Sequence, residues 1–247
     1  MAVVEKTVDI IGDERFTAML LAKTIPDDCP VDLYDEIVQK VRNYAMYKMG
    51  NLQSAIFPHV TAVGNYAFYD CAMLKKAEMP LCATLGERAF QNCPLLEEIE
   101  MPLVMYLNSS CFAGCTALTK AIFPGVTIMY GSGVFSGCPN LETVNFQKMT
   151  NLGDGCFSNN PTLEQIDLPS IKVIGSSAFS GCTGLRTVNL GPNITTIPAN
   201  AFSGTSSELV INLAVSEGAV ANAPWGATNA IINYEVPYSG TVPMPES

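Results

Sequence analysis

The residues best suited to chemistry in this sequence are acidic side chains that recur between apolar ones along the middle of the chain. Glu78, Glu98 and Glu100 belong to this set, as does Asp167, and lysines and amides occupy comparable positions. A pair of carboxylates could supply the acid and base of glycoside hydrolysis, whereas carboxylates mixed with lysines and amides suit recognition of a polar partner. We expect a solvated face of mixed charge or a partner-binding surface, because no nucleophile, base and orienting group gather with these carboxylates.

Other candidate catalytic or ligand-binding groups are sparse. The one histidine, His59, follows a proline, and no serine or cysteine nucleophile motif accompanies it. Gly131, Gly133 and Gly137 lack the G-x-G-x-x-G spacing of a dinucleotide site, and we interpret them as turn glycines. The sequence has nine cysteines without a C-x-x-C pair. We therefore predict no catalytic, cofactor-binding or metal-binding residue, and a protein that is not an enzyme.

A regular repeat must position the acidic residues. Seven phenylalanines recur at steps of 22 or 23 residues, namely Phe68, Phe90, Phe112, Phe135, Phe157, Phe179 and Phe202. A fixed period of this length is typical of a solenoid, in which each turn buries the apolar edge of its neighbours.

Each repeat contains the pattern of one short strand. Counting from each phenylalanine, the ninth and eleventh positions are apolar and alternate as in a strand, so the eighth and tenth positions face outward. We call these residues the outward strip and expect them to line the concave face of the coil and to bind a partner. The outward strip consists of Lys76, Glu78, Glu98, Glu100, Lys120, Ile122, Asn145, Gln165, Asp167, Thr187 and Asn189.

Five of the cysteines share the third position after the phenylalanine. They are Cys71, Cys93, Cys115, Cys138 and Cys182, with Asn160 and Thr205 in the other two repeats. We interpret them as buried, reduced thiols, because parallel side chains and an odd number of cysteines suit disulfide geometry poorly. Disulfides and metal binding remain alternatives.

The motif A-F-x-x-C-x-x-L, visible from Ala67, Ala89 and Ala178 onward, resembles the BspA-like, or Treponema-type, leucine-rich repeats. The resemblance covers about residues 44–213 and departs from the family pattern at Asn160 and Thr205. It implies an α/β repeat solenoid, a right-handed leucine-rich-repeat superhelix with a concave parallel sheet and one short strand per turn of 22–23 residues. It also implies a role in bacterial surface adhesion or host interaction.

Four segments follow from the limits of the repeat. Residues 1–42 contain two amphipathic patterns with acidic starts, at 13–23 and 32–41, which predict a helical N-terminal cap or an attachment segment. Residues 43–213 hold about eight repeats, and residues 214–236 form a C-terminal cap with Trp225 as its plug and a strand over 231–236. Residues 237–247 read as a flexible tail. The cap sequence is similar to the endings of repeat proteins encoded in prophages and gut bacterial genomes.

Composition and charge narrow the function. The chain has 247 residues, 48% apolar and 15% charged, with a net charge of −10, which opposes binding to nucleic acid. No apolar run is long enough for membrane insertion and no signal peptide is visible. The family resemblance favours the cell surface or a phage particle. We expect a non-enzymatic, monomeric protein that binds a protein or glycan on a host or neighbouring cell; the alternative is a structural or assembly subunit, such as a prophage tail protein, that contacts partners through its caps.

Overall fold

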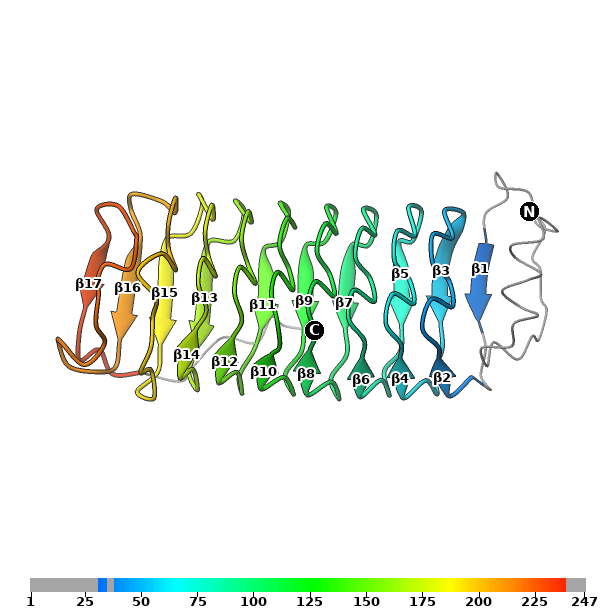
Figure 1. Ribbon diagram of the computed structural model, residues 1–247, viewed down its shortest axis with the longest axis horizontal. Coiled ribbons are helices and arrows are strands. Elements are labelled where there is room, and N and C mark those ends of the chain that lie inside the picture. Colours follow the sequence, from blue (N-terminus) through cyan, green and yellow to red (C-terminus); the bar gives the residue numbers. More distant parts are fainter. Residues whose placement is uncertain (1–30, 35–37, 239–247) are drawn as a thin grey trace.

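The computed structural model is a row of stacked turns and describes residues 31–34 and 38–238. Figure 1 shows the turns side by side along the long axis, with the sequence advancing steadily from one end to the other. Each turn has three sides, and backbone hydrogen bonds join it to its neighbours on all three. The prediction of a parallel-strand repeat solenoid is confirmed.

The first side is a row of parallel strands that we call the long-strand face. Its pairing runs β1–β3–β5, then β7–β9–β11, then β13–β15–β16–β17. The strands are β1 (Val31–Tyr34), β3 (Leu52–Ile56), β5 (Lys76–Glu78), β7 (Glu98–Glu100), β9 (Lys120–Ile122), β11 (Thr143–Asn145), β13 (Gln165–Leu168), β15 (Thr187–Leu190), β16 (Val210–Leu213) and β17 (Ile231–Asn233). Residues at the same repeat position are direct partners, as Ile166 and Val188 are.

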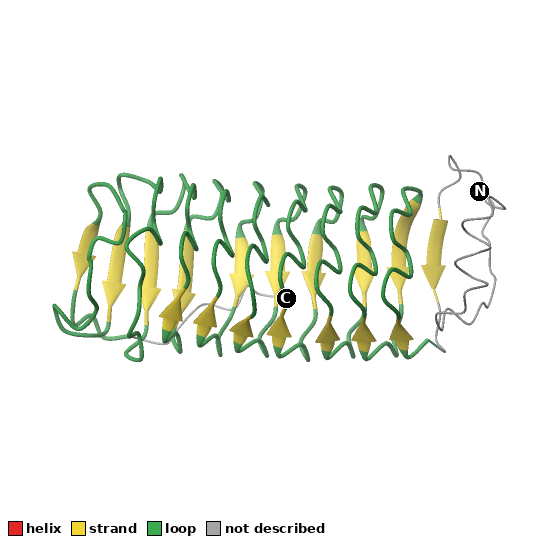
Figure 2. Ribbon diagram, viewed as in Figure 1, coloured by secondary structure: helices red, strands yellow, loops and turns green. Residues whose placement is uncertain are grey.

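The second side is another row of parallel strands, each two residues long (Figure 2). The expectation of a single strand per turn was therefore wrong. These strands are β2 (Lys40–Val41), β4 (Ala62–Val63), β6 (Thr84–Leu85), β8 (Tyr106–Leu107), β10 (Ile128–Met129), β12 (Asn151–Leu152) and β14 (Val173–Ile174). Two residues are too short for a visible alternation of apolar and polar side chains, so these strands have no signal in the sequence.

The third side, which we call the turn face, contains the repeating phenylalanines. Its turns have no strand, yet Phe68 N donates to Ala89 O at 2.7 Å and Phe90 N donates to Cys111 O at 2.8 Å. In the turns from Phe68 to Phe179, two positions adopt a left-handed backbone, two residues before and two residues after the phenylalanine. Gly133 and Gly137 occupy these positions with φ of +65° and +69°, which confirms their interpretation as turn glycines.

The phenylalanines form a continuous stack through the core. All seven are fully buried, and successive rings from Phe68 to Phe202 lie 4.8–5.7 Å apart between centroids with interplanar angles of 2–7°. Offset-stacked aromatic pairs contribute about 0.5–1.5 kcal/mol each beyond the area they bury. Met46 takes the place of the phenylalanine in the first repeat and is also buried.

The cysteine row is buried and linked to the phenylalanine stack. The Cys93 thiol donates to Phe68 O of the preceding turn at 3.1 Å, and Cys115 donates to Phe90 O at the same distance. Asn160 makes more contacts from the same position: its Nδ2 donates to Phe135 O at 2.9 Å and its Oδ1 accepts from Cys138 N at 2.9 Å. The cysteines act as small core residues that also satisfy a carbonyl.

The helical N-terminal cap is not supported where the structure describes it. Residues 31–34 and 38–238 contain no helix, and the predicted pattern over 32–41 is replaced by β1 and β2. β1 pairs in parallel with β3, and β2 pairs with β4. The ladder explains the outcome, because the open edge of β3 has backbone groups that a strand satisfies and a helix does not. The predicted helix over 13–23 lies outside the described residues.

The C-terminal end of the coil contains the only tryptophan of the sequence. Trp225 is fully buried, its Nε1 donates to Ala221 O at 2.7 Å, and its carbonyl accepts from Phe202 N at 3.0 Å. β17 pairs with β16, so the coil continues beyond residue 213. Of the predicted tail, only Pro237 and Tyr238 are described.

Asn160 provides a test of the inter-turn bonds. Asn160→Ala removes three hydrogen bonds and leaves Cys138 N and Phe135 O buried without these partners. We expect the free energy of unfolding to fall by about 2–4 kcal/mol, since each unsatisfied buried group costs about 1–3 kcal/mol. Asn160→Cys, which restores the thiol of other turns, should lose less than half as much in urea denaturation. Equal losses of unfolding free energy in the two variants would contradict the role of Asn160 in bonding between turns.

The buried thiols predict a decline of stability in alkali. Burial raises the pKa of Cys111 and Cys156 to about 12, from an ordinary value of 9.0. Thiols of the unfolded chain lose their protons near pH 9, whereas those of the folded chain keep theirs. The contribution of the thiols to the free energy of unfolding is therefore fully present below about pH 9 and is lost as the pH rises toward about 12. Each thiol should contribute a slope of about 1.4 kcal/mol per pH unit in that window.

The control for this decline is the double variant Cys111→Ala, Cys156→Ala. Alanine occupies the same position in other turns, as Ala67, Ala89, Ala178 and Ala201, so the variant should fold. Its stability should fall less steeply than that of the unchanged protein when both are unfolded in urea between pH 8 and 11. If the free energy of unfolding falls equally with pH in both proteins, groups other than these two thiols cause the decline.

Candidate binding surface on the long-strand face

The structure places the outward strip along the long-strand face, on β5 to β15. Its residues are exposed or half-buried, whereas the residues between them, such as Ile99, Ala121 and Val188, are buried. The register arranges the strip in two rows: Lys120 pairs with Glu98 in one row, and Ile122 pairs with Glu100 in the other. The sequence prediction that these residues share one face is confirmed, while their role in binding stays a prediction.

The N-terminal half of the strip is charged. Lys76 Nζ lies 2.7 Å from Glu78 Oε1, and Lys120 Nζ lies 4.0 Å from Glu98 Oε2. All four side chains are at least 39% exposed, so these ion pairs contribute little to stability. Their charges therefore remain accessible to a partner.

The C-terminal half of the strip is a ladder of amides that begins at a carboxylate. Asp167 accepts from Gln165 Nε2 at 2.9 Å and from Asn189 Nδ2 of the next turn. Asn189 Oδ1 accepts from Asn212 Nδ2 at 2.7 Å, and Asn212 Oδ1 accepts from Asn233 Nδ2 at 2.8 Å. These bonds fix the orientation of the amides, so the surface has a defined pattern of donors and acceptors.

Asn145 lies where the two halves meet. It is half-buried on β11, the last strand of its sheet, and its Oδ1 is buried without a hydrogen-bond donor. A buried acceptor without a partner is uncommon and suits a position where a ligand or water supplies the missing donor.

Tyr238 adds an aromatic residue that sequence reasoning placed in a loose tail. Burial, together with the negative charge of Asp167, raises the pKa of its hydroxyl above the ordinary value of 10.0. Tyr238 therefore lies within electrostatic range of Asp167, although its residue number gives no hint of this. Asn233 was also missed as a strip residue; its spacing of 21 residues from Asn212 was the available signal.

Catalytic groups do not converge with this surface in the described part of the chain. His59 lies in an exposed turn. Among residues 31–34 and 38–238, no three histidine, cysteine or acidic side chains are grouped to hold a metal ion, and no helix is long and apolar enough to span a membrane.

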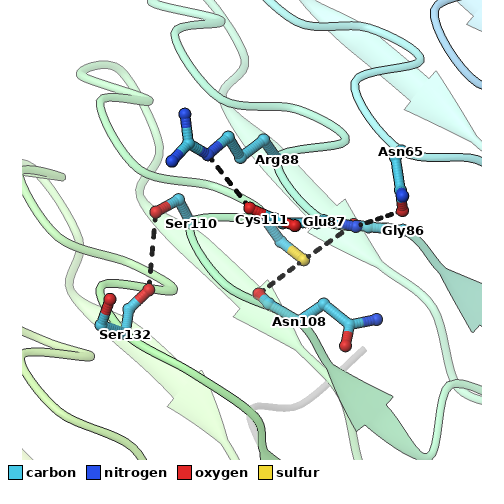
Figure 3. A network of polar contacts seen from close by, with 8 residues as sticks. All are labelled: Asn65, Gly86, Glu87, Arg88, Asn108, Ser110, Cys111 and Ser132. Atoms are coloured by element: carbon cyan, nitrogen blue, oxygen red, sulfur yellow. Dashed lines mark hydrogen bonds and ion pairs between the residues drawn. The ribbon is translucent and has the colours of Figure 1, made fainter.

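The turn face is held by a separate polar network (Figure 3). Asn65 Oδ1 accepts from Glu87 N at 2.9 Å, and the Cys111 thiol lies within hydrogen-bond distance of both Asn108 O and Gly86 O. These contacts join three successive turns and use backbone groups, so they stabilise the coil. Arg88 lies at the outer edge of the network, with Nε 3.3 Å from Glu87 Oε1.

Several solved bacterial structures are similar to this chain. A leucine-rich repeat protein from Bacteroides ovatus ATCC 8483 matches 82% of this chain at 19% identity with a TM-score of 0.53, and this chain spans 65% of that protein. A leucine-rich cell surface protein from Faecalibacterium prausnitzii A2-165 matches 82% of this chain and 84% of its own at 20% identity, with a TM-score of 0.46. The pneumococcal vaccine antigen PcpA matches 84% of this chain and 80% of its own at 12% identity, also with a TM-score of 0.46. No curated protein matches.

The repeat itself matches a family model. Six copies of the BspA type leucine rich repeat region cover residues 3–119, 39–163 and 150–216. The matched residues include the phenylalanine stack, the cysteine row and both rows of strands except β17. The chain belongs to the BspA type leucine-rich repeat family.

Proposed function

We propose that this protein is a non-enzymatic binding protein that presents its long-strand face to a protein or glycan partner. Membership of the repeat family supports a role in protein binding or surface adhesion. The observation that carries the proposal is the outward strip, whose polar residues stay in register over successive turns.

Rigidity of the strip supports recognition. Every strand of the face pairs with a neighbour, and the amides from Gln165 to Asn233 are held by hydrogen bonds to each other or to Asp167. A surface that is ordered before binding loses little conformational entropy when a partner arrives.

The chemistry of the strip favours a partner with mixed polar groups. The N-terminal half offers carboxylates and lysines, and the C-terminal half offers amides, Asp167 and Tyr238. Amides and a carboxylate suit the hydroxyl groups of a sugar or the backbone of a peptide. A host or neighbouring-cell surface carries both kinds of partner.

The test is binding of the purified protein to panels of extracellular-matrix proteins and of host and bacterial glycans. Charge reversal at Glu98→Lys, Glu100→Lys should weaken any detected binding about tenfold or more, because truncating or reversing central contacts removes most interface energy. Surface plasmon resonance measures the affinities.

The matched control is Glu87→Lys, Glu217→Lys, which changes the net charge equally at solvent-accessible positions away from the long-strand face. It should bind within about twofold of the unchanged protein, since distant rim charges contribute little. Equal losses in both variants would show a general charge effect. Unchanged binding in the strip variant would reject the long-strand face as the binding surface.

A further inference from the structure

Four tyrosines gather on the turn face at the N-terminal end of the coil, away from the outward strip. This tyrosine cluster consists of Tyr44, Tyr47, Tyr66 and Tyr69. Tyr44 stacks on Tyr66 with ring centroids 4.9 Å apart, and Tyr47 stacks on Tyr69 at 5.1 Å. Tyr44 is 51% exposed and Tyr47 is 39% exposed. The cluster is therefore an exposed aromatic surface made by two successive turns.

The coil does not need aromatic residues at these positions. Later turns have small residues two positions before the phenylalanine, namely Ser110, Gly133, Gly155 and Ser177, and one position after it, namely Ala113, Ser136, Ser158 and Ser180. The backbone bonds are nevertheless the same: Tyr66 N donates to Glu87 O at 2.9 Å, and Ser110 N donates to Ser132 O at 3.0 Å. The backbone of these turns therefore does not require tyrosine at these positions.

Two of the tyrosines occupy a costly backbone conformation. Tyr44 and Tyr66 have φ of +59° and +56°, in the left-handed region where Gly133 stands in a later turn. Bulky residues are uncommon in this region, and residues held there concentrate at functional sites. Tyrosine at these positions indicates a use for the side chain.

Cations surround the cluster in a protein whose net charge is −10. The Arg88 guanidinium lies 5.5 Å from the Tyr66 ring centroid, and Lys48 Nζ lies 5.5 Å from that of Tyr47. Lys40 and Arg42 line an adjoining open hollow of about 570 Å³ that also includes Asn43 and Asn65, the residues directly before Tyr44 and Tyr66.

Two carboxylates, Asp70 and Glu87, belong to the same stretch of the turn face, and Glu87 pairs with Arg88, whereas Lys40 and Lys48 have no ion-pair partner among the described residues. The third turn continues the two aromatic columns with Arg88 and Gln91, and Gln91 Oε1 is buried without a hydrogen-bond donor. A buried acceptor beside exposed aromatic and cationic groups is a position where a bound molecule could donate.

We propose that the tyrosine cluster, with Lys48 and Arg88, is a second binding surface for an acidic peptide segment of a partner protein. Tyrosine and arginine are the residues that dominate protein interfaces, and the surrounding cations select negative charge. In each stacked pair, one ring covers a face of the other ring. Sugars bind by stacking on exposed ring faces, and fewer such faces are available here. The arrangement therefore favours a peptide, which also supplies backbone N–H groups for acceptors such as Gln91 Oε1.

The test uses a displayed library of random 12-residue peptides, selected on the full-length protein. The comparison variant is Tyr44→Ser, Tyr47→Ser, Tyr66→Ser, Tyr69→Ser, which installs a residue that later turns use. We expect enriched peptides to carry net negative charge and to bind the variant about tenfold or more weakly, as for loss of central interface residues. Arg88→Ser alone should weaken the same peptides and reduce the salt dependence of their binding.

The matched control is Tyr106→Thr, Tyr130→Ser, which removes two exposed tyrosines from the short-strand side and should leave peptide binding unchanged. The melting temperature of the quadruple variant should stay within about 5 °C of the unchanged protein. A larger loss would overturn the proposal by showing a structural role.

Three further outcomes would also overturn it: no enrichment, enrichment of neutral or basic peptides, and tighter binding of hyaluronate or chondroitin sulfate at the same residues. Neither variant touches the long-strand face, so this result is independent of the proposed function. Sedimentation of the unchanged and quadruple variants would reveal a second copy of the chain as the occupant instead.

Discussion

The structure depends on the alignment of equivalent residues in successive turns. Each turn can bury its apolar edge and satisfy its backbone only if equivalent positions of the next turn lie beside its own. Phe90 then stacks on Phe68, and the Cys93 thiol donates to Phe68 O. Backbone bonds on all three sides then reinforce the same alignment. A shift of one residue would break the ring stack, the thiol bonds and the ladders together, and this shared requirement makes the register cooperative.

The features that repeat could be predicted from the sequence, and those that occur once could not. The phenylalanine spacing identified the coil, and alternation at positions nine and eleven located the long strands from β5 to β16. The predictions that were wrong have local causes. The residues of β1 have apolar spacing compatible with a helix, and they form a strand because the edge of β3 offers unpaired backbone groups. The two-residue strands lack any alternation of their own.

The same distinction between repeating and single features applies to the candidate site. Glu98, Lys120 and Asp167 were placed on one face by counting, because the period carries the direction of each side chain. Tyr238 lies outside the period, so counting repeat positions could not relate it to Asp167. The tyrosine cluster lies within the period, and its signal is an exception to the pattern: two turns have tyrosine at both positions, where the turns from Phe112 to Phe179 have serine, glycine or alanine. In a repeat protein, such exceptions point to function more directly than the consensus does.

The buried thiols have a consequence for where and when the protein can fold. The eight cysteines from Cys71 to Cys182 lie inside the coil, where neither an oxidant nor another protein's sulfur can reach them. While the chain is unfolded, the same groups are available for mispairing, and an oxygen atom added to sulfur would have no room between the turns. Completion of the coil is therefore also the step that protects these eight thiols from an oxidising environment, and a nascent chain that met such an environment early would lose the route to its native form.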